Sequence, residues 1–213
     1  MSGNARITSI PFERSVFVNC PFDNDYLPIL QAIVFAIHDC EFVARSAVEA
    51  TKQHELRIDK ITRLVGESQF SIHDISRIQI TADSPLPRFN MPFECGLALG
   101  AVRYGRRKGR DFLLLSGSPF SEKQTLSDLA GQDAISHGND PNKAIAAVRR
   151  FLASKSATPP RGAKSICNRY ERMSSEMPDL ARALDLELRE VLSFDYLPEF
   201  ITLAVEWIAA HGS

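Results

Sequence analysis

Short runs of β-branched and aromatic residues alternate with amphipathic stretches between residues 16 and 152. The runs predict strands, and the stretches between them show the apolar spacing of helices. The predicted strands cover residues 16–19, 42–45, 70–74 and 111–115, with a weak fifth strand at 134–136. The predicted helices cover residues 26–40 and 56–65, a segment that begins near Pro92, and residues 144–152. Alternation of this kind favours a parallel sheet, so we predict a five-unit open α/β domain.

The composition changes after residue 153. Residues 154–162 contain Pro, Gly, Ser and Thr and are typical of a linker, whereas residues 163–213 are helical in pattern. We therefore predict an α/β domain over residues 1–153 and a helical extension over residues 163–213. The extension has more apolar area than a short helical tail is expected to bury, so we expect it to mediate homo-oligomer formation. Its large apolar side chains are Phe194, Tyr196, Phe200, Ile201 and Trp207.

Glu94 is a lone carboxylate within the small, apolar segment from Met91 to Gly100. Pro92 suits the first turn of a helix, where its missing N–H is no loss. The helix dipole favours the ionised carboxylate near this end, while apolar neighbours raise its pKa, and this conflict is typical of a catalytic acid or base. The alternative is structural, because the dipole alone favours an acidic residue in a first turn.

Polar and aromatic side chains follow several predicted strands. Open α/β sheets bind ligands outside the carboxyl ends of their strands, where these segments are expected to converge. Phe22 could stack on a ring or tuck into the core, and Asp74 could orient a sugar hydroxyl or cap the next turn through Ser76 or Arg77. The candidate ligand contacts are Asn19, Phe22, Arg45, Asp74, Arg77 and Asn90.

Composition narrows the function classes. The 25 basic and 26 acidic residues give a net charge of −1, so general nucleic-acid binding is not expected. The basic run over residues 103–110 is interpreted as a helix cap and a solvated loop. Neither a signal peptide nor a membrane span is apparent, and the four scattered cysteines are typical of reduced thiols, so we expect a cytoplasmic protein.

Several common kinds of site are missing from the sequence. The glycine fingerprints of dinucleotide and P-loop sites do not occur, and neither does the serine-hydrolase elbow. No metal site is predicted, because none of the five histidines has a partner at ligand spacing. His73 is interpreted as a hydrogen-bonded core residue. The chemistry that is left after these exclusions requires one well-placed carboxylate and a pocket.

Three segments carry a family resemblance. Val16-Phe-Val-Asn-Cys-Pro-Phe22, Ser71-Ile-His-Asp-Ile-Ser76 and Asn90-Met-Pro-Phe-Glu-Cys-Gly-Leu-Ala98 resemble, in order, signature segments of bacterial nucleoside 2-deoxyribosyltransferase-like and Toll/interleukin-receptor (TIR)-like proteins. The resemblance covers Ser15 to about Leu152, and its most specific part is the stretch that begins at Glu94. It implies a TIR-like sheet in flavodoxin-like strand order.

The resemblance also implies a chemistry. Such transferases usually place an Asp and a Gly-Thr before the glutamate helix, whereas this chain has Pro87-Arg-Phe-Asn90, which favours hydrolysis over deoxyribosyl transfer. The implied activity is an N-glycosidase acting on NAD or on a nucleoside or nucleotide, in bacterial defence or signalling. Glu94 would act at the sugar carbon, Asn90 and Asp74 at the ribose. Phe22 would stack on the leaving ring.

Two further expectations complete this hypothesis. Arg45 and Arg77 could meet a phosphate, and NAD would be a substrate, since no cofactor is predicted. The alternative is a non-catalytic TIR-like domain that binds a nucleotide or acts as a scaffold, because a fold does not determine a function.

Overall fold

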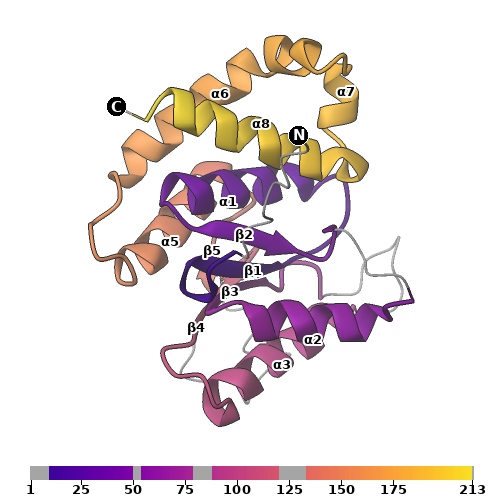
Figure 1. Ribbon diagram of the computed structural model, residues 1–213, viewed down its shortest axis with the longest axis vertical. Coiled ribbons are helices and arrows are strands. Elements are labelled where there is room, and N and C mark those ends of the chain that lie inside the picture. The colour runs from indigo at the N-terminus through magenta and orange to yellow at the C-terminus, as the bar shows by residue number, and fades with distance from the viewer. Residues whose placement is uncertain (1–9, 50–53, 79–87, 120–132, 213) are drawn as a thin grey trace, which may run out of the picture.

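The computed structural model describes residues 10–49, 54–78, 88–119 and 133–212 (Figure 1). Within them, five parallel strands form one open sheet in the order β2-β1-β3-β4-β5. This confirms the predicted parallel sheet and its flavodoxin-like order. The strands are β1 (Ser15–Asn19), β2 (Val43–Ser46), β3 (Phe70–Asp74), β4 (Asp111–Ser116) and β5 (Ile135–Ser136).

Helices cover both faces of the sheet, because alternate residues of a strand point to opposite faces. Val16 and Val18 belong to the same apolar cluster as α1 (Leu27–Asp39) and α5 (Pro141–Ala153). Phe17, between them, packs instead with residues of α2 (Arg57–Glu67) and α3 (Asn90–Tyr104). In Figure 1, α1 and α5 accordingly lie above the sheet and α2 and α3 below it.

A third layer of helices covers the outer side of α1. It consists of α6 (Ala163–Ala183), α7 (Leu188–Val191) and α8 (Leu197–Ala210), and η3 (Phe194–Tyr196) leads into α8. The predicted C-terminal helical extension is therefore confirmed. Since α1 lies between the sheet and these helices, its apolar residues are buried around most of its circumference, as its dense apolar pattern predicts.

Two aromatic residues of the extension, Phe200 and Trp207, are buried within the chain, whereas Phe194 and Tyr196 are half-buried. Phe200 and Trp207 belong to the cluster that includes α1, and the Trp207 ring centroid lies 6.0 Å from that of Phe35. For Phe200 and Trp207, the expectation that a helical tail cannot bury its apolar area is wrong, because α1 presents a second apolar face. Formation of a homo-oligomer stays a prediction that these side chains no longer support.

The segment between the two predicted parts, residues 154–162, contains no helix or strand. One apolar cluster nevertheless continues from the sheet into α6 and α8, so residues 163–213 share a core with the α/β part. The predicted loop over residues 80–90 falls mostly outside the described residues. Among the residues that are described, no helix has both the length and the apolar character needed to cross a bilayer.

The basic run over residues 103–110 lies at the ends of two helices, because Arg103 is in the last turn of α3, as expected, and Arg110 lies against the end of α2. The guanidinium of Arg110 donates hydrogen bonds to the carbonyl oxygens of Val65, Gly66 and Ser68, at 2.7 to 2.9 Å. These carbonyls lie at the end of α2, where backbone acceptors lack helical partners. The run therefore also closes α2, a contact between segments that only the fold brings together.

Candidate functional site

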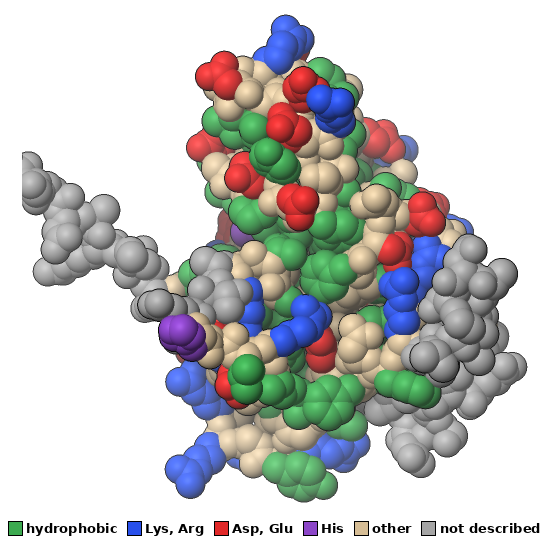
Figure 2. Space-filling view, turned by 90° about the vertical axis from the view of Figure 1, so that its right-hand side faces the viewer, with side chains coloured by type: hydrophobic (Ala, Val, Ile, Leu, Met, Phe, Trp, Pro, Cys, Tyr) green, Lys and Arg blue, Asp and Glu red, His purple; other side chains and the backbone are tan. Residues whose placement is uncertain are grey.

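The candidate residues gather where the strands end. Asn19 ends β1, Asp74 ends β3, and α3 begins beside them with Asn90. Figure 2 looks onto this edge of the sheet, where acidic, basic and hydrophobic side chains lie side by side. The convergence that the strand ends predict is present for these segments.

Glu94 lies in the second turn of α3, because this helix begins at Asn90 rather than at Pro92. The first-turn dipole argument for a purely structural role is therefore weaker than expected. Glu94 is only 5 % exposed. Its Oε1 atom lies 3.7 Å from Nη2 of Arg57, whose side chain is 60 % exposed.

Two opposing influences act on the Glu94 carboxyl. Burial raises its pKa above the ordinary value, and the Arg57 guanidinium lowers it in part. Neighbouring thiols are poor nucleophiles by comparison, since burial raises the pKa of Cys95 to about 12. Burial, together with the charges of Asp74, Glu94 and Asp23, raises the pKa of Cys20 well above its ordinary value. Both thiols are thus protonated at neutral pH, and the Glu94 carboxyl is the candidate among these three groups.

Asn19 connects β1 to the first turn of α3. Its Nδ2 atom donates to the backbone oxygen of Met91 at 2.9 Å and to Nδ1 of His73 at 3.0 Å. Since Nδ1 of His73 accepts, Nε2 carries the hydrogen and donates to Oγ of Ser71 at 2.9 Å. Burial lowers the pKa of His73 to about 3, so its ring is neutral. His73 is a hydrogen-bonded core residue, as expected, and Asn19 fixes the start of the glutamate helix.

Asp74 is fully buried, and both its oxygens have protein partners. Oδ1 accepts from the backbone N–H of Ser76 at 2.8 Å, and Oδ2 accepts from Nε2 of His137 at 2.8 Å. Nδ1 of His137 in turn accepts from the backbone N–H of Asn139. Asp74 therefore caps the turn after β3 and holds the segment after β5. Direct contact with a ribose stays a prediction that these hydrogen bonds do not support.

Ser76, His137 and Asp74 do not form a catalytic triad. Oγ of Ser76 lies 3.1 Å from Nε2 of His137, the same nitrogen that donates to Asp74. A triad needs the serine and the carboxylate on opposite ring nitrogens. This agrees with the missing serine-hydrolase elbow in the sequence.

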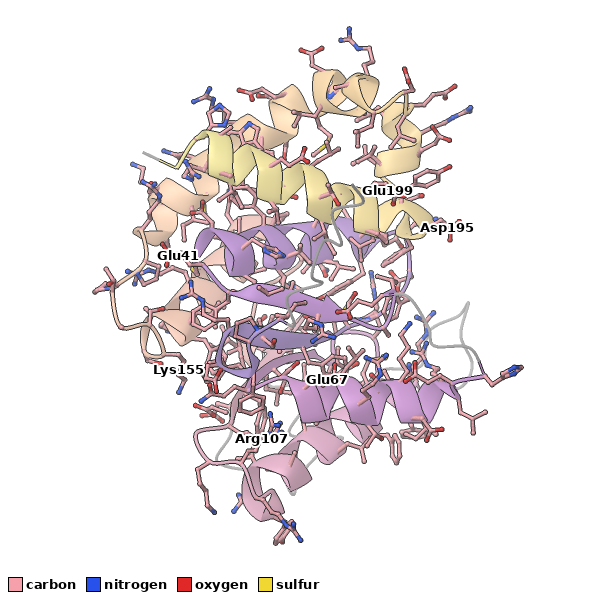
Figure 3. All side chains as sticks on the ribbon, viewed as in Figure 1. Glu41, Glu67, Arg107, Lys155, Asp195 and Glu199 are labelled. Carbon is pink, nitrogen blue, oxygen red and sulfur yellow. The ribbon has the colours of Figure 1, made fainter. Side chains whose placement is uncertain are left out.

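Phe22 lies over the site rather than in the core. Its ring is half-buried, 5.5 Å between centroids from Phe194 and 5.9 Å from the guanidinium carbon of Arg57. Phe194 precedes α8, so the C-terminal helices reach the edge of the sheet at this point. Figure 3 shows the neighbouring Asp195 and Glu199 at this end of the molecule, whereas Glu41 and Lys155 lie at the opposite end.

The remaining predicted contacts differ in their surroundings. Arg45 is buried and bound by two carboxylates, those of Glu49 at 2.8 and 3.0 Å and Glu67 at 3.1 Å. Its donors are thus directed to protein partners, and a phosphate contact is not supported there. Asn90 is exposed at the start of α3, and Arg77 pairs with Asp23 at 3.7 Å.

Sequence reasoning missed four residues at this edge: Arg57, Asp23, Arg88 and His137. Arg57 could have been recognised from the sequence, because it begins the amphipathic pattern of α2. A helix that follows a strand begins at the carboxyl edge of a parallel sheet, where the ligand site is expected. The other three are recognised only through their partners in space. Among the described residues, no group of three His, Cys, Asp or Glu side chains could hold a metal ion.

A scan against protein-family models, a search of curated proteins and a search of solved structures each found no match for this chain.

Proposed function

We propose that the chain is an N-glycosidase that cleaves the N-glycosidic bond of NAD or of a nucleoside or nucleotide. The observation that carries this proposal is the buried Glu94 carboxylate at the carboxyl edge of the sheet, whose guanidinium neighbour, Arg57, is largely in solvent. A carboxylate in a poorly solvated position interacts strongly with a cation that develops next to it. The anomeric carbon of a sugar is such a cation when its base departs.

The reaction breaks the bond between C1′ and the ring nitrogen, and the electron pair leaves with the base. An oxygen of Glu94 either bonds to C1′, after which water hydrolyses the ester, or stabilises the charge while water attacks directly. The oxygen of water becomes the C1′ hydroxyl. With NAD the nicotinamide leaves neutral and a proton goes to solvent, whereas with a nucleoside that proton goes to the base.

Other side chains have supporting roles in this proposal. Phe22, half-buried beside Arg57, would stack on the departing ring, an interaction of about 1–3 kcal/mol for a nucleobase. Asn90 is exposed one turn before Glu94 and is available to a ribose hydroxyl. Asn19 acts indirectly by holding the backbone of Met91, and Asp74 by holding the turn after β3.

The test measures base release from NAD, nucleosides and nucleotides by chromatography. Glu94→Gln should lower the rate by roughly three orders of magnitude, because losing the charge at a sugar cation costs several kcal/mol. Glu41→Gln is the matched control, since Glu41 is exposed at the opposite end of the molecule. Near-wild-type turnover in Glu94→Gln would refute the role of Glu94.

The non-catalytic alternative predicts a different result. Nucleotide binding that raises the melting temperature, with no base released by any preparation, would favour a nucleotide-binding domain. The ion pair between Arg57 and Glu94 favours this non-catalytic alternative, because it occupies the carboxylate in the absence of a ligand.

A further inference from the structure

Two arginines converge on one carboxylate at the edge of the candidate site. Nη1 of Arg88 lies 3.3 Å and Nε of Arg77 lies 3.7 Å from the same oxygen, Oδ2 of Asp23. The other oxygen, Oδ1, accepts from the backbone N–H of Tyr26 at 3.0 Å. Asp23 is therefore fixed by the turn before α1, and it holds both guanidinium groups in place.

This pair of arginines is not neutralised by its partner. Two positive charges share one negative charge, and the distances to Oδ2 are longer than those of a close bidentate pair. The side chains of Arg77 and Arg88 are 35 % and 43 % exposed, and Asp23 is the acidic partner that the structure gives them among the residues it describes. Arg45 provides the contrast within the same chain, since Glu49 and Glu67 bind its guanidinium and its side chain is only 9 % exposed.

The arginine pair adjoins the proposed site through the loop after β1. Asp23 follows Phe22 directly, and the Phe22 ring lies beside Arg57, the partner of Glu94. Arg88 lies two residues before the start of α3, the helix that carries Glu94. A ligand with its base on Phe22 and its sugar at Glu94 would thus occupy the same edge of the sheet as this pair.

We infer that Arg77 and Arg88, anchored by Asp23, bind a phosphoryl group, and that the substrate of this site is a nucleotide rather than an unphosphorylated nucleoside. The planar guanidinium matches two phosphate oxygens at once, and a phosphate outcompetes water for donors that are held in place before it arrives. This inference rests on the proposed function and narrows its substrate class. Mononucleotides and dinucleotides both carry a phosphoryl group, and the experiment below distinguishes between them as ligands.

The experiment measures binding by calorimetry to Glu94→Gln protein, in which turnover is suppressed. The probes are two matched pairs, nicotinamide riboside with its 5′-monophosphate and adenosine with AMP, and NAD as the dinucleotide. We expect each monophosphate to bind at least tenfold more tightly than its nucleoside. In the triple variant that adds Arg77→Gln and Arg88→Gln, this ratio should fall at least tenfold toward one.

Two control variants accompany the measurement of this affinity ratio. Arg189→Gln removes an arginine whose side chain is 82 % exposed in α7, and it should leave the ratio unchanged. Arg77→Lys with Arg88→Lys keeps both charges but removes the planar fork, and it should retain part of the preference. This pair of lysines also covers the case in which the glutamine variant fails to fold.

Each outcome bears on the inference. Equal affinity for nucleosides and monophosphates, or a preference that survives loss of both arginines, overturns it, although base release by the wild type would leave the proposed function standing. Absence of base release and of binding by every probe would overturn both. Among supporting results, tighter binding of NAD than of either monophosphate would identify a dinucleotide as the ligand.

Discussion

The Oε1 atom of Glu94 lies 3.7 Å from Nη2 of Arg57, so a buried carboxylate is paired with a guanidinium that stays largely in water. The pair contributes little to stability, because solvent around Arg57 screens it and the arginine loses side-chain entropy on pairing. The pair instead affects the protonation of Glu94. Burial raises the pKa of the carboxyl and Arg57 lowers it, so both residues control the fraction of ionised Glu94.

Glu94→Gln is expected to stabilise the fold at neutral pH. The folded pKa of Glu94 is raised above its ordinary value of 4.5, so its contribution to stability is complete below pH 4.5 and is lost as the pH rises through the folded value. The difference in the free energy of unfolding between variant and wild type should thus grow across this window. Urea titrations at pH 4 and pH 7 measure it. An unchanged difference would mean that Glu94 is well solvated.

Arg57→Gln is expected to raise the pKa of Glu94 further. It removes the one charge that lowers this pKa, while the burial of the carboxyl remains. The acidic limb of the profile of kcat/KM against pH should therefore move to higher pH. An NMR titration of the Glu94 carboxyl provides a readout that does not depend on activity. A limb that moves to lower pH would show that Arg57 does not act on Glu94 through its charge.

Acid is expected to destabilise the protein below about pH 6.5 through two histidines, His73, which is fully buried, and His38, which is half-buried. Burial lowers the pKa of His73 from 6.5 to about 3 and that of His38 from 6.5 to about 4. In this window the unfolded chain binds more protons than the folded chain, so stability falls as the pH falls. Unfolding free energies between pH 7 and pH 4 test the trend. Titration of the His73 ring near pH 6.5 in the folded protein would contradict it.

Trp207→Ala is expected to destabilise the whole fold by about 3–5 kcal/mol, the usual cost of truncating a buried aromatic side chain. Trp207 packs near Phe35 of α1, and its Nε1 atom donates to Oε2 of Glu176 at 2.6 Å. Urea unfolding followed by circular dichroism measures the loss. Val205→Ala is the control, since Val205 is exposed on the same helix. A loss below about 1 kcal/mol would indicate that α8 is a separate, weakly docked element.

The sequence alone determined the alternation of strands and helices and the parallel sheet. Runs such as residues 16–18 and 112–115 could be recognised because a strand buried on both faces is apolar at nearly every position. Glu94 could be recognised because a charge in an apolar helix is unusual. These are local signals, in which the residues that carry the pattern are neighbours in the chain.

Only the tertiary structure decided which side chains meet. Asp74 could have faced a ligand or a turn, and it is His137, 63 residues later, that occupies its second oxygen. Arg45 and Arg77 were equivalent as phosphate candidates until the fold placed Glu67 against one and left the other exposed beside Asp23. Phe200 and Trp207 of the extension became core because α1 has a second apolar face. Such pairings depend on distances in space between residues far apart in the chain, and periodicity along a sequence does not contain them.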